Sequence, residues 1–433
     1  MALIGPGPAE AAVYRRRVSG RSSPNWVRLG ATAVAAVVVA EAAAWLLRPR
    51  EIEQPVKAGE DAYFSHDELT KARDYASGQR LILVGSLVAE GAVLVLLTTG
   101  RPAMGRRALE RLGDRPLLGG AAAAAGLSVA IAVVTVPFGI AAHERSADVG
   151  LSTQSLGGWA TDWVKATGIG AVLAGLLGTL GLALIRRFGR RWWIPGSVAV
   201  VAGAAFFTWI APVVLAPLFN KFEALPQGQV RSDVLALARK AGVDVGQVYR
   251  VDASRRTTAI NAYVNGVGSS KRVVLYDTLI DDLNRGERDS VIAHELGHVK
   301  GNDIQRGLLF VALVTPLALI FVSGASRALV GRRGVELGQP ASLPALALAI
   351  GVTSFVIGIA GNQLSRAVEA RADTFALQLT DDPKGMIELQ QQLADRNLSD
   401  PDPPDAFTFV FGTHPPAIER IGAALAWERG ERP

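Results

Sequence analysis

Long stretches with almost no charged residues limit what this chain can fold into. We identify seven of them, each of about 20 residues or more, which is the length that a helix needs to cross a bilayer. The 433 residues are 49% hydrophobic and their mean hydropathy is positive, which is too apolar for an ordinary soluble enzyme. The sequence therefore predicts a mainly α, polytopic membrane protein. The predicted spans lie at residues 29–47, 81–99, 117–141, 168–185, 193–218, 307–329 and 342–361.

The spans divide the chain into five predicted parts. These are a basic N-terminal tail at 1–28, a five-span membrane domain at 29–219, a soluble segment at 220–306, two further spans at 307–361, and a C-terminal segment at 362–433. In the soluble segment, hydrophobic periodicity predicts a helix and three short strands. We expect a small α+β domain with a helix at 230–241 and strands near 248–252, 259–264 and 272–276.

The most specific motif is His294-Glu295-Leu296-Gly297-His298, at the end of the soluble segment. Residues four apart lie one above the other on a helix, so both imidazoles can contact one zinc ion. The glutamate between them can take a proton from water at the metal, as in zinc peptidases. A chance match on a solvated helix face is a poor alternative, because the chain has only 5 histidines. Asn284 and Glu287 resemble a capping box, which predicts where this helix begins.

A catalytic zinc site needs a third protein ligand and an open fourth position. The longer pattern H-E-x-x-H-x-x-G-x-x-H would supply a histidine, but Ile304 occupies that place. We therefore predict Glu369, on a later helix, as the third ligand, which makes the site gluzincin-like. Asp373, one turn further on, would orient a ligand histidine through its second ring nitrogen. The alternative for this pair is an ordinary charged helix surface, neutralised by the arginines nearby.

Charge and cysteine content exclude several classes of structure and function. The chain has no cysteine, so it has neither a disulfide framework nor a thiolate zinc site. The net charge of +6 does not indicate nucleic-acid binding, because the arginines cluster beside the spans and are typical of topology signals and contacts with anionic lipids. The clusters are Arg15 to Arg17, Arg106 and Arg107, and Arg186, Arg187, Arg190 and Arg191.

These motifs, in this order, resemble those of type I CAAX prenyl endopeptidases of the HtpX/CAAX superfamily, in a bacterial-type form. The resemblance spans most of residues 60–426 and is specific from Ala216 onward. It is carried by the segment from Ala216 to Gly228, Asn261-Ala262-Tyr263, Val273 to Leu279, the HELGH motif, the SRxxExxAD motif around Glu369, and Thr413-His414-Pro415-Pro416.

The resemblance implies further roles. His414 matches a histidine that steadies the oxyanion of the tetrahedral intermediate, and Arg420 matches an arginine beside it. Asn261 and Ala262 match an edge strand that pairs with extended substrate. The resemblance also implies that the spans surround a large water-filled chamber. Glu41 and Glu90, which lie within spans, would either line that chamber or act in a proton relay.

The charge distribution and the family resemblance imply opposite sides of the membrane for the metal site. Arginine-rich segments at the N-terminus, after the second span and after the fourth should be cytoplasmic, which puts the metal site outside. The resemblance implies a catalytic side that faces the cytosol. A cleavable signal peptide is an alternative for the first span, where Ala40-Glu41-Ala42 has cleavage-like spacing, and it would not change the predicted side.

We therefore predict a membrane-embedded zinc metalloendopeptidase with one Zn²⁺ per chain, in the plasma membrane if the source is bacterial. Its expected partners are the lipid bilayer and a peptide or protein substrate that is membrane-associated or C-terminally modified in a CAAX-like way. One alternative is an HtpX-like quality-control protease with the same chemistry. Another is a transporter or receptor in which the zinc is structural. The sequence does not predict an oligomeric state.

Overall fold

The structure, a computed structural model, describes residues 26–265, 271–331 and 333–431. In this part of the chain, seven helices are long and apolar enough to cross a membrane, which confirms the predicted number of spans. Most of the expected tail at 1–28 lies outside the described residues. The seven helices are α2 (Trp26–Leu47), α3 (His66–Thr98), α5 (Pro116–Asp148), α6 (Leu156–Phe188), α7 (Trp193–Ile210), α11 (Asp303–Gly331) and α12 (Leu343–Thr380).

Several of these helices are longer than the apolar runs that predicted them. Helix α3 begins at His66, about 15 residues before its apolar run, because Ser65 and Glu68 form a capping box at a polar end. Helix α12 continues to Thr380, so it crosses the expected boundary at 361/362 without a break. The last membrane span and the segment with Glu369 are therefore one continuous helix.

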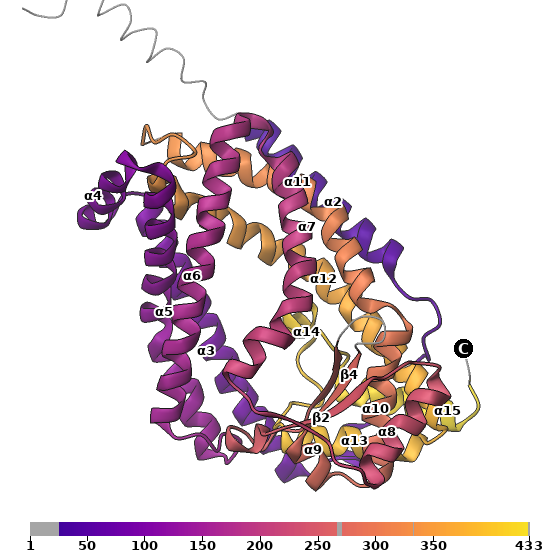
Figure 1. Cartoon of the computed structure of the whole chain (residues 1–433). Coiled ribbons are helices and arrows are strands. Elements are labelled where there is room, and N and C mark those ends of the chain that lie inside the picture. The colour runs from indigo at the N-terminus through magenta and orange to yellow at the C-terminus, as the bar shows by residue number, and fades with distance from the viewer. Residues whose placement is uncertain (1–25, 266–270, 332, 432–433) are drawn as a thin grey trace, which may run out of the picture.

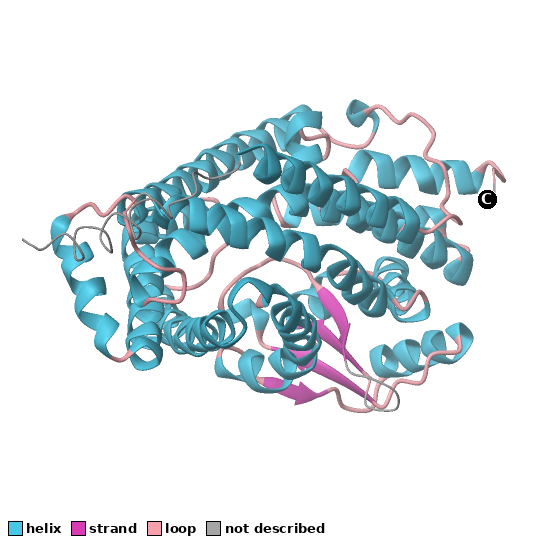
Figure 2. Cartoon of the chain, turned by 90° about the horizontal axis from the view of Figure 1, so that it is seen from above, coloured by secondary structure: helices cyan, strands magenta, loops and turns pink. Residues whose placement is uncertain are grey.

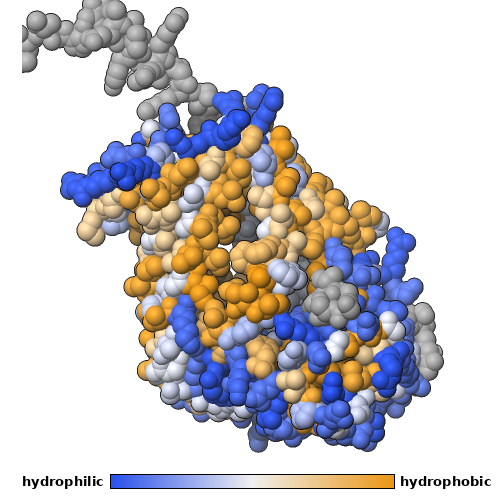
Figure 3. Space-filling view, in the orientation of Figure 1, coloured by the Kyte–Doolittle hydropathy of each residue, from blue (hydrophilic) through white to orange (hydrophobic). Residues whose placement is uncertain are grey.

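The membrane helices stand around a common centre, with the sheet at one end (Figures 1 and 2). In the space-filling view, an apolar band lies between two hydrophilic ends (Figure 3). Helices α5 and α6 pack closely through small residues, since a Cβ added at Gly178 would lie 2.5 Å from the Cβ of Ala124. A mainly apolar cavity of about 690 Å³ lies among the membrane helices, and Glu90 lines it. Glu41 instead contacts the side chain of Gln363.

A four-stranded sheet has the order β1-β2-β4-β3. Strands β2 and β4 are parallel, whereas β1 pairs with β2 and β3 pairs with β4 in antiparallel fashion. The first strand was not predicted from the sequence, and β3 begins three residues later than expected. Strand β3 is at an edge of the sheet. One of its outer backbone groups, the Ala262 N–H, donates to the Asn261 side-chain oxygen over 2.8 Å. The strands are β1 (Phe222–Ala224), β2 (Gln247–Val251), β3 (Ala262–Asn265) and β4 (Arg272–Tyr276).

A dense apolar core joins the sheet to the helices around it. Leu275, Leu279, Ile292, Leu296 and Leu377 belong to this core and are fully buried. The core includes residues of α8, α10, α13, α15 and the end of α12, so it fixes the helix that carries the HELGH motif. The remaining α-helices are α4 (Ala103–Arg111), α8 (Gln229–Ala241), α9 (Asp277–Asp282), α10 (Arg285–Lys300), α13 (Pro383–Arg396), α14 (Asp405–Phe411) and α15 (Ala417–Glu428).

Candidate metal centre and active-site cleft

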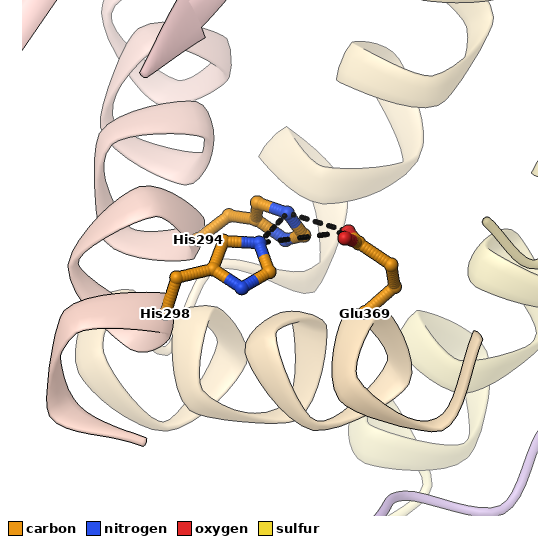
Figure 4. A group of neighbouring side chains, drawn as sticks. All are labelled: His294, His298 and Glu369. Carbon is orange, nitrogen blue, oxygen red and sulfur yellow. Dashed lines mark hydrogen bonds and ion pairs between the residues drawn. The ribbon is translucent and has the colours of Figure 1, made fainter. Parts of the chain in front are cut away.

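Helix α10 presents the two histidines of the motif on one face. Asn284 caps it as predicted, since its side chain accepts from the Glu287 N–H at 3.1 Å and Glu287 accepts from the Asn284 N–H at 2.8 Å. The rings of His294 and His298 turn toward each other, with their Nε2 atoms 3.1 Å apart (Figure 4). This is the arrangement that the i, i+4 spacing predicts.

Glu369 reaches the two histidines from α12. Its Oε2 lies 3.1 Å from His294 Nε2 and 3.6 Å from His298 Nε2 (Figure 4). Helix α12 can approach α10 this closely because Gly297 lacks a side chain, and a Cβ added there would lie 3.2 Å from the Cα of Ala372. The candidate ligand atoms of the three residues all lie within 4.8 Å of one another, so one ion could contact all of them.

Asp373 lies where it can orient His294. Its Oδ1 is 2.8 Å from His294 Nδ1, so the ring can donate there and keep Nε2 free as a ligand. Arg420, expected beside His414 as a substrate-binding residue, is also buried against Asp373. It donates to both carboxylate oxygens, over 2.7 Å and 2.5 Å. The bidentate pair holds Asp373 ionised and in a defined orientation.

Asp303, which was not predicted from the sequence, performs the same task for His298. Asp303 Oδ2 lies 3.0 Å from His298 Nδ1 and accepts a hydrogen bond from Arg371 over 2.7 Å. The signal was weak, because Asp303 begins α11 and is not on the helix of His298. The turn between these helices, which includes Asn302 at a φ of 53°, brings the carboxylate back to the imidazole.

The local electrostatics fit a metal cation. Glu369 Oε2 is buried and accepts no hydrogen bond from the described residues, although two imidazole nitrogens are close to it. Burial lowers the pKa of His298, but the hydrogen bond to Asp303 and the nearby Glu369 carboxylate outweigh burial and raise that pKa to about 10. A cation that replaces this proton would satisfy the same carboxylate, and two imidazoles with one carboxylate are a common donor set for zinc.

Of the three candidate ligands, His294 lines a cleft of about 600 Å³. Burial raises the pKa of Glu295, which lines the cleft, and the backbone N–H of Val264 on edge strand β3 hydrogen-bonds to it. On the opposite side, the exposed His414 has its Nε2 3.4 Å from Glu369 Oε2. The cleft thus brings together the sequence-predicted residues His294, Glu295, Asn261, Ala262, His414 and Arg420.

Comparisons with known proteins agree with this layout. The family model "CAAX prenyl protease N-terminal, five membrane helices" matches residues 51–221, and the model of peptidase family M48 matches residues 224–428. An uncharacterized metalloprotease of Bacillus subtilis, YhfN, is 33% identical over 305 residues, which cover 68% of this chain and 70% of that protein. A CAAX prenyl protease 1 homolog of Arabidopsis thaliana is 34% identical over 227 residues, which cover 49% of this chain and 51% of that protein.

The crystal structure of S. mikatae Ste24p resembles the whole fold. The TM-score is 0.76 at 19% sequence identity, and the match covers 92% of this chain and 98% of Ste24p. The two family models meet between α7 and β1, so one match covers the membrane helices before the sheet and the other covers both the HELGH helix and Glu369. The chain therefore belongs to peptidase family M48, as a multi-pass membrane metalloprotease of the CAAX prenyl protease type.

Proposed function

We propose that the metal of this protease is zinc, held by His294, His298 and Glu369. The observation that carries this proposal is the buried Glu369 Oε2, which lies against two imidazole Nε2 atoms and accepts no hydrogen bond from the described residues. A buried carboxylate oxygen that accepts no hydrogen bond is costly, so this arrangement favours a cation at that point. Three nitrogen and oxygen ligands with one position left open are typical of a catalytic zinc site.

The cleft supports hydrolysis of a peptide bond. A bound zinc ion would make water a stronger nucleophile at neutral pH and would polarise the scissile carbonyl. Glu295 takes a proton from the attacking water and returns it to the leaving amine, and its raised pKa favours that return. His414, at the rim of the cleft, donates a hydrogen bond to the developing oxyanion. Asp373 and Asp303 hold the two ligand imidazoles in orientation.

The substrate we propose is a membrane-associated or C-terminally lipidated, CAAX-like peptide. An extended peptide can add to the edge of β3, where Asn261 and Ala262 line the cleft. Glu369 lies on the helix that also forms the last membrane span, which favours substrates already at the membrane. The match to the N-terminal model with five membrane helices favours this proposal over an HtpX-like quality-control protease.

The test compares the detergent-purified wild type with Glu295→Gln and, as a matched control on the same helix, Asp289→Asn. Zinc content and cleavage are measured on the same preparations. The substrates are a farnesylated CAAX peptide and an unstructured membrane-anchored peptide without that sequence. We expect one zinc per chain in all three proteins and cleavage lost only in Glu295→Gln, with the farnesylated peptide preferred. Full cleavage by Glu295→Gln at equal zinc content would refute the mechanism, and preference for the other peptide would favour quality control.

A further inference from the structure

Part of the cleft lining, from α9, α10 and α13, is apolar. Helix α13 packs against α10 there, and side chains from both helices and from α9 line the cleft. Leu279 and Leu389 are 0% and 2% exposed, so these side chains are packed tightly against their neighbours. The apolar lining residues are Leu279, Val291, Leu389, Leu393 and Ala394.

One uncharged polar side chain lies among these apolar residues. Gln390 is 2% exposed, yet it is one of the residues that line the cleft. Among the described residues, its Nε2 donates a hydrogen bond only to the thioether sulfur of Met386, at 3.5 Å, and its carbonyl oxygen accepts none. A thioether is a weak acceptor, and a primary amide can donate two hydrogen bonds and accept two.

Gln390 lines the cleft, so a polar group bound there could supply the hydrogen bonds that the described residues do not. Burial of an amide without a partner is unfavourable, and nearly all buried polar side chains in proteins are hydrogen-bonded. A leucine at this position would fit the surrounding aliphatic side chains without that cost. A polar group bound in the cleft would give this glutamine a stronger partner than the Met386 sulfur.

We propose that Gln390 is a specificity-determining residue, which selects substrates with a carboxamide side chain next to the scissile bond. A carboxamide can exchange two hydrogen bonds with Gln390, whereas a charged side chain would lose its hydration among aliphatic neighbours. A site that hydrogen-bonds a substrate group discriminates strongly against analogues that lack the group, because its own polar atoms are then left unpaired. This inference rests on the proposed function, since it assigns the cleft to peptide substrate.

The neighbouring sequence supplies a matched control. Residues 390–392 are three consecutive glutamines on α13, and helical rotation points them in different directions. Gln392 is half-buried and does not line the cleft. Gln390→Leu and Gln392→Leu therefore make the same chemical change on the same helix, and only the first changes the cleft.

Binding is measured on the full-length, zinc-loaded protein in detergent, with Glu295→Gln in every sample so that no peptide is cleaved. The probes are farnesylated Gly/Ala/Ser peptides with one variable residue, glutamine in one and the similarly sized methionine in the other. We expect the glutamine peptide to bind at least about tenfold more tightly. Gln390→Leu should abolish or reverse this preference, and Gln392→Leu should keep it. Equal binding of the two peptides, no measurable binding of the glutamine peptide, or an unchanged preference in Gln390→Leu would overturn the proposal.

Two further measurements separate a role of Gln390 in specificity from a structural role and from the protease activity itself. The thermal unfolding midpoint of Gln390→Leu should equal or exceed that of the wild type, because an unpaired amide is replaced by an apolar group. A midpoint as low as that of Leu389→Ala would show a structural role and contradict the proposal. Cleavage by the protein with Glu295 intact tests the proposed function. A binding preference without cleavage would support the Gln390 subsite and contradict the proposed protease function. Cleavage without a binding preference would support the protease function and contradict the subsite.

Discussion

The two halves of this protein are stabilised in different ways. In the peptidase half, Leu275 and Leu296 are fully buried in one continuous core. In the membrane half, Leu176 and Val198 are 64% and 67% exposed on the protein surface, where lipid replaces protein as the apolar surrounding. Precise positioning of the metal centre therefore depends on the peptidase core, and the membrane half contributes mainly through the points where it enters that core.

Glu369 is the residue through which the membrane half contributes most directly to the metal centre, because α12 runs from the last membrane span to the two histidines. Glu369→Ala should lower cleavage by roughly 10³-fold or more, as loss of an essential active-site group does, and should reduce the zinc content. The control is Glu388→Ala on α13, which should keep both. Zinc content is measured by mass spectrometry and cleavage by peptide release. Normal zinc content in Glu369→Ala would show that the two halves do not share the metal site.

Matched leucine substitutions test the difference in packing directly. Leu275→Ala should destabilise the protein by about 2–5 kcal/mol, because it leaves a cavity in a core without water. Leu176→Ala, on the exterior of α6, should change stability by less than about 0.5 kcal/mol in the same detergent. Unfolding midpoints of both variants give the comparison. Equal losses would mean that the membrane half has a protein core of the same kind.

The hydrogen bond that orients His298 should have a moderate effect. Asp303→Asn removes the carboxylate that lies 3.0 Å from His298 Nδ1, and loss of such a partner weakens metal affinity by about 10- to 100-fold. Titration with a chelator in competition for zinc measures this effect. Asp289→Asn, at a half-buried position of α10 paired with Arg285, should keep wild-type affinity. If Asp303→Asn also kept it, the residue would serve only to join α10 to α11.

The smallest effect is expected where membrane helix α3 meets the loop beside the cleft. Arg80 donates to Asp400 Oδ2 over 2.7 Å, and the Asp400 side chain is 5% exposed. Arg80 also lies over the ring of Phe407, with its guanidinium carbon 4.8 Å from the centroid. Arg80→Gln should cost about 1–2 kcal/mol of stability and lower kcat/KM several-fold, while Arg187→Gln should change neither. An unchanged kcat/KM would show that α3 does not position the cleft loop.

Helix periodicity and local spacing account for the parts of the site that could be predicted. An apolar run long enough to cross a bilayer specifies a span on its own, and i, i+4 spacing places His294 with His298 and Glu369 with Asp373 on shared helix faces. The structure brings these two faces together. The resemblance to a known family added His414 and the edge strand at Asn261, which no local pattern indicates.

Tertiary contacts account for the parts that could not be predicted. Asp303 lies on a different helix from His298, and Arg420 pairs with Asp373 from 47 positions away. No sequence period links such residues. The start of β3 was placed too early because the chain before it is held by other contacts, among them the Ile260 N–H, which donates to Asn397 Oδ1. These contacts form only when the core assembles.

The most direct test of the central claim is X-ray absorption spectroscopy of zinc in the purified full-length protein, because it counts the imidazole ligands. We predict two imidazoles, one carboxylate and an exchangeable water, at zinc–nitrogen distances of about 2.0–2.1 Å. His414 is the residue that could close the site, since its Nε2 is 3.4 Å from Glu369 Oε2. A third imidazole with no exchangeable water would contradict a catalytic centre and favour a transporter or receptor with structural zinc.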